Sequence, residues 1–302
     1  EADKDAMELL SVLKMEKVNK PTIFIGMGSC GIIAGADKTK EAVEQYFAAR
    51  NIDAEIIATG CLGICSLEPL MDIQLPGKNR VCFQRVTFNK VNPILDSIFN
   101  SILIEEDVLA QYRNQFSEPY EQVSYLDELP FFKHQHKNIT AQCGIINPIS
   151  IEQYIAYNGY KAFVKSITGK SPQEVIEIID KSELRGRGGG GFSTGKKWKI
   201  ASNAQSRKKY LICNADESDP GAFMDRALIE SDPHRLVEGI TIACYAIGAS
   251  EAYVYIRNDY KIAIQRLQQA INDAKNYGLL GENILDTGIN IEISLIKGAG
   301  AF

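Results

Sequence analysis

The sequence predicts an α/β protein made of two domains. In the first third, strand-like and helix-like segments follow the order β-α-β-β-β-α, and beyond residue 209 strand-like runs alternate with helix-length amphipathic segments. Alternation of this kind is typical of parallel sheets that carry helices on their faces. The 302-residue chain is 45% hydrophobic and 24% charged, which leaves enough apolar residues for two cores.

The first domain is predicted to open with a strand at 22–26, a helix at 39–51 and a strand at 54–59. The helix is expected because Ala42, Val43, Tyr46 and Phe47 fall on one face at helical spacing. Two more strands, at 69–75 and 80–86, are joined at Pro76-Gly77. A helix at 91–102 is expected to complete the domain.

Residues 104–145 lack sustained periodicity and mix Tyr, Glu, Gln and Pro. This composition predicts an extended linker that lies over a surface. The expected organisation is therefore a first domain at 1–103, a linker at 104–145 and a second domain at 146–302.

The second domain is expected to contain a helix that starts at the capping box Ser171-Pro-Gln-Glu174. Val175, Ile176, Ile178 and Ile179 supply its apolar face. The segments that follow the helix are predicted strands at 209–213, 251–256 and 289–296 and predicted helices at 234–248 and 262–277.

A glycine-rich loop, Leu184-Arg-Gly-Arg-Gly-Gly-Gly-Gly-Phe192, is the most informative motif. Glycines let backbone amides approach a phosphate, and Arg185, Arg187 and Lys197 add positive charge, so the loop is expected to bind an anion. A glycine run alone is a weak signal. The dinucleotide fingerprint also requires a preceding strand, whereas this loop follows a predicted helix.

Polar residues follow the predicted strand at 209–213, namely Asn214, Asp216 and Glu217. Ligands of open α/β sheets bind at the carboxyl ends of strands, so loop and strand end are predicted to face one pocket. The alternative is a polar turn after the strand and a solvated pair of arginines in the loop.

These motifs resemble a known family in both order and spacing. Residues 184–192, Gly195-Lys-Lys-Trp198 and 213–226 are similar to the NADH-binding, FMN-carrying flavoprotein subunit of respiratory complex I and its relatives in soluble NAD-linked hydrogenases and formate dehydrogenases. Ser218 stands where the family usually has glycine. The resemblance implies a Rossmann-like, parallel-sheet domain that binds FMN and NAD(H).

The resemblance also implies roles for individual residues. Those expected to hold FMN are Gly186, Arg187, Gly188, Lys197, Asn214 and Asp216. NADH is expected beside Gly189, Gly190 and Phe192, with the aromatic ring available to stack on adenine. Glu217 corresponds to an acidic residue close to flavin and nicotinamide, and is the expected catalytic-site residue.

The implied activity is that of an NADH:acceptor oxidoreductase subunit, in which a hydride passes to FMN and single electrons then pass to iron–sulfur clusters. The implied partners are iron–sulfur subunits of a hydrogenase, formate dehydrogenase or complex I-like assembly. Ferredoxin is a co-substrate in bifurcating members. The alternative function is a non-catalytic docking subunit with degenerate cofactor sites.

The chain ends at Lys297-Gly-Ala-Gly-Ala-Phe302, before the Cys-Gly-Glu-Glu stretch that completes the flavin site in the family. Phe302 corresponds to the family's aromatic residue beside the flavin. We therefore expect the sequence to represent the front part of such a protein, as a fragment, a split gene product or part of a longer polypeptide.

Three cysteines, Cys30, Cys61 and Cys65, follow the first two predicted strands. Gly60-Cys-Leu-Gly-Ile-Cys65 with Glu68-Pro69 resembles a thioredoxin-like [2Fe–2S] ferredoxin, which presents Cys-x4-Cys and Cys-x3-Cys. Such a cluster takes four thiolates, but Ile25 occupies the position of the missing ligand. Two interpretations stay open: Ser29 or Cys82 completes the site, or the domain carries no cluster and serves in docking.

Other candidate residues give weaker signals. Cys143, Cys213 and Cys244 stand singly and are expected in packed surroundings. His134 and His136 have no neighbouring carboxylate or thiolate, and His234 is expected near a helix start.

The net charge of −5 gives no footprint for nucleic acid, and no apolar run is long enough to span a membrane. The seven cysteines cluster by spacing rather than pairing across the chain, which favours a reducing, cytoplasmic compartment.

Overall fold

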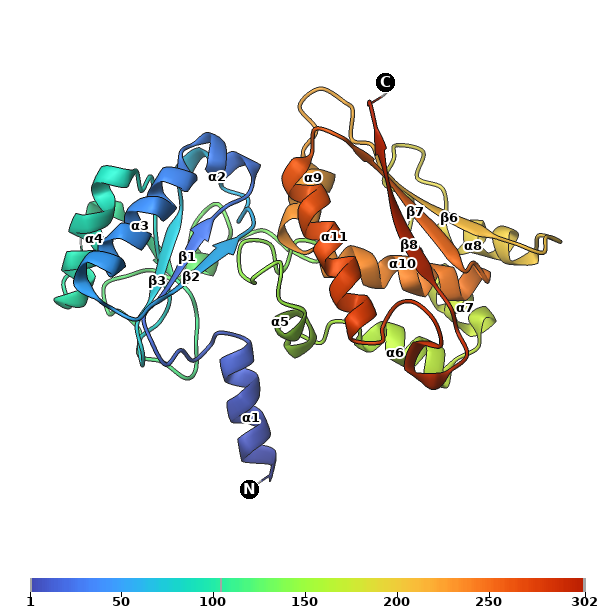
Figure 1. The fold of residues 1–302 in the computed structure, drawn as a ribbon, viewed down its shortest axis with the longest axis horizontal. Coiled ribbons are helices and arrows are strands. Elements are labelled where there is room, and N and C mark those ends of the chain that lie inside the picture. Colours follow the sequence, from blue (N-terminus) through green and yellow to red (C-terminus); the bar gives the residue numbers. More distant parts are fainter. Residues whose placement is uncertain (1, 104, 301–302) are drawn as a thin grey trace. The chain divides into compact units, whose positions relative to one another are not determined.

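The computed structural model describes residues 2–103 and 105–300, and Phe302 lies outside them. The chain divides into two compact units (Figure 1). The first comprises Glu1–Ala156 and Glu230–Asp232, and the second comprises Tyr157–Ile229 and Pro233–Phe302. Both units mix helices with strands, so the predicted α/β class is confirmed.

The first unit is built on a five-stranded sheet with the order β2-β1-β3-β4-β5. The strands are β1 (Thr22–Gly26), β2 (Glu55–Thr59), β3 (Met71–Gln74), β4 (Val81–Phe83) and β5 (Val108–Gln111). Only β1 and β2 pair in parallel; β3, β4 and β5 pair antiparallel with their neighbours. Strand order and directions agree with the predicted β-α-β-β-β-α arrangement.

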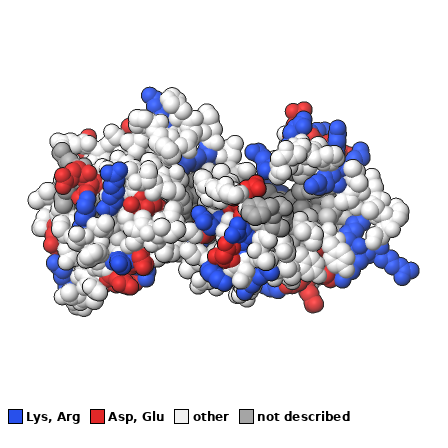
Figure 2. Space-filling view, turned by 90° about the horizontal axis from the view of Figure 1, so that it is seen from above, with Lys and Arg blue, Asp and Glu red and all other residues white. Residues whose placement is uncertain are grey.

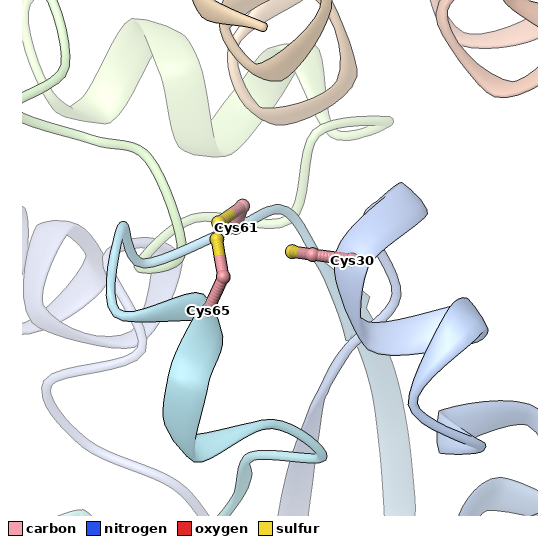
Figure 3. A group of neighbouring side chains, drawn as sticks. All are labelled: Cys30, Cys61 and Cys65. Atoms are coloured by element: carbon pink, nitrogen blue, oxygen red, sulfur yellow. Dashed lines mark hydrogen bonds between the residues drawn. The ribbon is translucent and has the colours of Figure 1, made fainter. Parts of the chain in front are cut away.

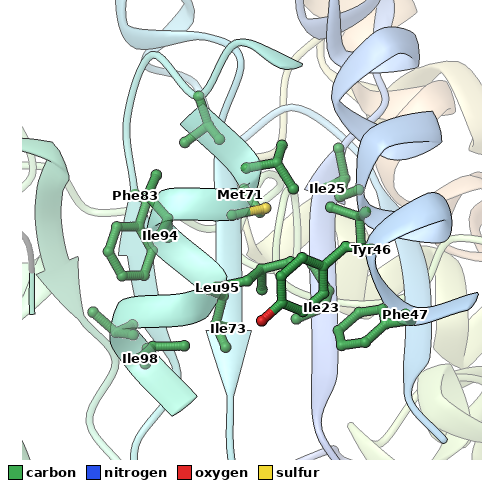
Figure 4. Packing of buried hydrophobic residues seen from close by; sticks show 14 of the residues in the cluster. Ile23, Ile25, Tyr46, Phe47, Met71, Ile73, Phe83, Ile94, Leu95 and Ile98 are labelled. Atoms are coloured by element: carbon green, nitrogen blue, oxygen red, sulfur yellow. The ribbon is translucent and has the colours of Figure 1, made fainter. Parts of the chain in front are cut away.

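Helices α3 (Ala36–Arg50) and α4 (Val91–Phe99) pack against this sheet. Figure 4 shows how Tyr46 and Phe47 of α3 meet Ile23 and Ile73 of the strands in one apolar cluster. Burial of such a cluster is the main favourable term for folding. The strand ends that precede Cys30 and Cys61 are thereby held on a rigid core.

The region expected to be a linker differs from the prediction. It contributes β5, which pairs with β4 and completes the sheet of the first unit. A four-residue strand offers too few alternations to stand out from an irregular segment. Helix α1 (Ala2–Leu13) precedes the first strand and is a further addition to the predicted elements.

The first unit also contains α2 (Ser29–Ile33) and α5 (Ile151–Ala156). Short 3-10 turns occur at Cys65–Leu67, Phe88–Lys90, Glu105–Asp107 and Leu126–Glu128. The turn at Cys65–Leu67 directly follows the loop that carries Cys61, and α2 begins one residue before Cys30.

The second unit holds a three-stranded parallel sheet with the order β6-β7-β8. Its strands are β6 (Tyr210–Ala215), β7 (Glu251–Arg257) and β8 (Glu292–Gly298). In the register, Leu211 pairs with Ala252, and Ala252 pairs with Ile293. The predicted parallel sheet is therefore confirmed, and the carboxyl ends of all three strands meet at one edge.

The helices of this unit are α6 (Lys161–Gly169), α7 (Pro172–Lys181), α8 (Thr194–Asn203), α9 (Met224–Ser231), α10 (Pro233–Ile247) and α11 (Lys261–Asn276), with a 3-10 turn at Ile284–Asp286. Helices α10 and α11 pack against each other and contact the sheet (Figure 1). Val175 and Ile176 of α7 pack with Ala246 of α10, and Trp198 of α8 lies against this cluster. The predicted capping box is confirmed, because the Ser171 hydroxyl accepts the Glu174 amide and the Glu174 carboxylate accepts the Ser171 amide.

Acidic and basic side chains are interspersed on the face shown in Figure 2. Within the described part of the chain, no helix combines the length and apolarity needed to cross a bilayer.

Candidate functional site

The glycine-rich loop leaves α7 and enters α8, as the sequence predicts. The Gly186 amide donates to the Phe192 carbonyl at 2.8 Å, and the Thr194 amide donates to the Leu184 carbonyl at 2.9 Å. These bonds close the base of the loop as in a short hairpin. The four glycines from 188 to 191 form its exposed tip.

The tip of the loop has room for a ligand. A Cβ built on Gly188, Gly189, Gly190 or Gly191 would meet no atom within 4 Å. Gly189 and Gly191 have φ angles of +93° and +58°, which glycine adopts without the steric penalty of other residues. Exposed amides in such a conformation can converge on an anion. The loop geometry therefore fits the phosphate of a nucleotide cofactor.

Positive charge near the loop is available to an anion. Arg187 and Lys197 are exposed, and neither makes an ion pair within the residues that the structure describes. Arg185 instead donates to the Gly191 carbonyl at 3.2 Å, so it braces the loop from inside. Of the three predicted cations, Arg187 and Lys197 are thus the two without a partner to displace.

The entry of the loop into α8 is held tightly. Ser193 caps the helix by accepting the Lys196 amide at 3.2 Å. A Cβ on Gly195 would lie 2.4 Å from the Asp180 Cα, so only glycine permits α7 and α8 to approach this closely. This contact fixes the helix that carries Lys197.

The residues after β6 form a second polar group. The Asn214 side chain accepts the Asp216 amide at 2.9 Å, which makes a turn directly after the strand. Ser218, where the family usually has glycine, donates to the Asp216 carboxylate at 3.1 Å. Both predicted FMN-binding residues of this turn therefore already carry one protein hydrogen bond each.

Glu217 sits at the start of α9. Its carboxylate accepts the amides of Asp225 at 2.9 Å and Arg226 at 3.1 Å. Carboxylates are stabilised at helix amino termini by the exposed amides and by the helix dipole. The Tyr260 hydroxyl and the Arg257 guanidinium bond to the Glu217 carbonyl, so residues after β7 also fix this position.

Sequence reasoning does not single out Arg257 and Tyr260. Their one available signal is their position just after a predicted strand. Burial is the largest cause that raises the pKa of Tyr260, with the Glu217 charge adding to it. A phenol that stays protonated is a permanent donor toward Glu217.

The structure brings the predicted residues together in two groups. The hydrogen bonds of 185–192 stay within the loop, whereas those of 214–217 link the strand end to α9 and the end of β7. Phe192 is 53% exposed, so its ring is accessible for stacking. A common pocket for the two groups stays a prediction.

The three cysteines of the first unit form one group. Their sulfur atoms all lie within 4.8 Å of one another, and the Cys61 and Cys65 sulfurs are 3.5 Å apart. Figure 3 shows Cys30 extending from α2 toward the two sulfurs of the neighbouring loop. The structure thus juxtaposes the three metal-ligand candidates that the sequence suggests.

Protonation differs among these cysteines. A hydrogen bond from Cys30 is the largest cause that lowers the pKa of Cys61 to about 6, and the same bond raises the pKa of Cys30. The Gly63 amide also donates to the Cys61 sulfur at 3.3 Å. Cys61 is therefore the readiest thiolate, which is the form that binds metal.

The two candidates for a fourth ligand are placed differently. Cys82 is fully buried on β4 in a second apolar cluster, as expected of a core residue. Ser29 is engaged by Glu230, which the chain division groups with this unit: the Ser29 hydroxyl donates at 2.5 Å and its amide at 2.8 Å. Ile25 is fully buried in the main core of the first unit.

Sequence reasoning misses Glu68 as a site residue. Its carboxylate is buried beside the cysteines, with Oε1 3.7 Å from the Cys30 sulfur. Burial is the largest cause that raises the pKa of Glu68 to about 7. The available signal is a charged residue three positions after a Cys-x3-Cys motif.

The weaker candidates take structural places. Cys143 and Cys244 are buried, and Cys213 is half-buried. His234 lies in the first turn of α10, as predicted, where its Nδ1 is 3.0 Å from the Tyr160 hydroxyl. In the described residues, His134 and His136 join no group of metal-ligand atoms.

The chain resembles known proteins over its second half. Residues 179–302 match the family model described as the Nuo51 FMN-binding domain. The HndC subunit of an NADP-reducing hydrogenase from Solidesulfovibrio fructosivorans is 52% identical over 170 residues, which cover 56% of this chain and 34% of the relative. An NADH-quinone oxidoreductase subunit of Aquifex aeolicus (strain VF5) is 54% identical over 153 residues, which cover 51% and 35%.

The chain therefore spans about a third of the length of these two relatives. Among solved structures, an NAD+-reducing [NiFe]-hydrogenase in the H2-reduced state aligns with 97% of this chain and 46% of its own, at 20% identity and a TM-score of 0.46. The resemblance that the glycine loop predicts is confirmed: residues 179–302 match the Nuo51 FMN-binding domain family.

Proposed function

We propose that this chain is the nucleotide-binding part of an NADH:acceptor oxidoreductase flavoprotein subunit. One observation carries the proposal: within the region that matches the Nuo51 FMN-binding domain, an open glycine tip lies beside two exposed, unpaired cations, Arg187 and Lys197. This combination suits a phosphate, because amides and cations bind it together. A surface loop without a ligand has no need of either feature.

The FMN site is proposed to use both polar groups. Gly186, Gly188 and the loop amides bind the phosphate, with Arg187 and Lys197 balancing its charge. Asn214 and Asp216 supply hydrogen bonds to the polar parts of the cofactor. When bound, FMN accepts a hydride from a nicotinamide and delivers its electrons singly.

The nicotinamide side is proposed to lie at Gly189, Gly190 and Phe192. Glycine leaves the backbone accessible, and the exposed Phe192 ring offers a face for the adenine. Glu217 is held in one place by two α9 amides and by Tyr260. We infer that this carboxylate orients the nicotinamide and sets the local charge, without forming a covalent bond.

Partners and compartment extend the proposal. The relatives are named as subunits of an NADP-reducing hydrogenase and of NADH-quinone oxidoreductases, so we propose a cytoplasmic, multisubunit assembly with iron–sulfur partners. Hydrogenase, formate dehydrogenase and complex I-like assemblies all fit, with ferredoxin as an additional co-substrate in a bifurcating one.

The test is FMN binding by the 302-residue chain, followed by quenching of flavin fluorescence. Lys197→Gln should weaken affinity by about tenfold to a hundredfold, since charge-assisted hydrogen bonds to phosphate are among the strong ones. Lys199→Gln, on the same helix and equally exposed, is the matched control and should leave affinity unchanged. Equal affinities for both variants would contradict the site. Absence of flavin binding would support the docking subunit instead.

A further inference from the structure

The carboxylate of Glu68 is an unusual buried charge. The residue is 8% exposed, and it makes no ion pair among the residues that the structure describes. Its Oε2 accepts the Leu70 amide at 2.7 Å, and its Oε1 faces the Cys30 sulfur at 3.7 Å. Burying a carboxylate without a compensating cation costs several kcal/mol (about 3 or more). A metal ion beside Cys30 would supply that compensation.

The four side chains form two pairs. Cys61 and Cys65 are 3.5 Å apart, and Cys30 and Glu68 are 3.7 Å apart. With metal–sulfur bonds of about 2.3 Å, two ligand atoms on one tetrahedral metal lie roughly 3.8 Å apart. Each pair thus has the spacing of two ligands on one ion. Glu68 is outside the compact group formed by the three sulfurs, as expected of a ligand at one end of a two-metal site.

We propose that Glu68 is the fourth ligand of a [2Fe–2S] cluster, in which Cys61 and Cys65 bind one iron and Cys30 and Glu68 bind the other. The donor count then reaches the four that such a cluster requires. The inference concerns only the first unit, so it stands or falls independently of FMN binding.

The surroundings of Glu68 explain how its carboxylate reaches this place. A Cβ on Gly26 would lie 3.0 Å from Oε2, and a Cβ on Gly31 would lie 3.3 Å from the same atom. The carboxylate therefore fills the space left by glycine at the end of β1. Ile25, the residue before it, instead packs in the core. The ligand absent from β1 is replaced from the neighbouring loop.

An oxygen ligand gives the two irons different surroundings. One iron has two thiolates and the other has one thiolate and one carboxylate, and ligand identity influences both potential and lability. Two inequivalent irons are a spectroscopic signature of the wild-type protein. This signature requires no variant and no turnover.

The test uses the full chain, reconstituted without oxygen with ferrous iron and sulfide. We expect about two irons and about two sulfides per chain. The Mössbauer spectrum of the oxidised protein should show two distinct ferric sites of equal area. One doublet for two equivalent irons would overturn the proposal, as would a single metal ion without sulfide or a folded protein that retains no iron.

Glu68→Gln removes the charge and keeps the shape, so retained iron should fall to about half or less and the spectrum of the carboxylate-bound iron should change. Glu68→Asp keeps the charge on a shorter arm and should lie between the two. Glu230→Gln is the matched control: Glu230 is also buried in this unit but binds Ser29 rather than a cysteine. An unchanged cluster in folded Glu68→Gln, or equal loss in Glu230→Gln, would contradict ligation by Glu68.

Discussion

The Tyr260 hydroxyl donates to Glu217, at 3.0 Å from its carbonyl oxygen and 3.2 Å from its carboxylate. One phenol thus ties both the backbone and the side chain of the proposed catalytic-site residue. Tyr260 is 8% exposed, and Arg226 and Arg257 lie over its ring, so it is itself held in place. Glu217 is consequently positioned from two sides, by α9 and by the segment after β7.

Changing the charge of Glu217 should alter turnover. We expect Glu217→Gln to lower kcat or shift the flavin potential, because the charge near the reacting atoms changes while the size is kept. Tyr260→Phe should act in the same direction with a smaller effect, since it removes one donor and leaves the carboxylate. Steady-state NADH oxidation with ferricyanide is the measurement. Wild-type kinetics in both variants, with FMN bound, would remove Glu217 from the site.

Loss of the Phe192 ring should act on nucleotide binding. Phe192→Ala should raise the apparent KM for NADH by roughly three- to tenfold with kcat nearly retained, because stacking contributes similarly to ground and transition states. Phe192→Tyr keeps the ring and should restore the wild-type KM. If the alanine variant lowers kcat and leaves KM unchanged, the ring does not bind the nucleotide.

The tip of the glycine loop should not tolerate an acidic residue. Since a Cβ at Gly188 meets no protein atom, Gly188→Asp should fold normally and yet lose FMN through charge repulsion. Gly239 is exposed on α10 and equally unhindered, so Gly239→Asp is the control and should retain flavin. Flavin content after desalting compares the two. Full flavin in Gly188→Asp would show that the phosphate binds elsewhere.

A buried ion pair in the first unit should be critical for stability. Arg80 donates to Asp72 at 2.7 Å, stacks over Phe24 and also donates to the carbonyls of Gly144 and Ile145. Arg80→Leu leaves Asp72 charged and unpaired, which should lower the free energy of unfolding by about 3–5 kcal/mol. Chemical denaturation followed by circular dichroism measures this change.

The double variant Arg80→Leu with Asp72→Leu separates charge from packing. It should recover part of the loss, because no unpaired charge then remains in the core. A double variant that is no more stable than Arg80→Leu would assign the loss to the contacts of the guanidinium rather than to the orphaned carboxylate.

Long periodic elements could be predicted from the sequence because they bury one face. Ala42, Val43, Tyr46 and Phe47 predict a helix, and three of them contribute to the core in the observed α3. Strand β5 falls within the expected linker because Val108 and Leu109 are only half-buried in a four-residue strand. Its pairing with β4 depends on residues 25 or more positions away, which local patterns do not register.

The candidate site shows the same division. The glycine loop could be predicted because its composition and its spacing to Lys197 are local. Glu68 could not, because its burial depends on Gly26 and Gly31, which are distant in sequence and adjacent in space. Likewise, the support that Tyr260 gives to Glu217 arises only when β6 and β7 pair.

The closed base of the glycine loop has a thermodynamic consequence. Bonds between 184 and 194 and between 186 and 192 already restrict the backbone on both sides of the tip. Ordering a residue costs about 1–2 kcal/mol of conformational free energy, so a loop restrained in advance loses less entropy when an anion arrives. The glycines, which have the most freedom to lose, are thus confined to four positions between fixed ends. Affinity gained in this way depends on rigidity of the loop base rather than on any added contact with the ligand.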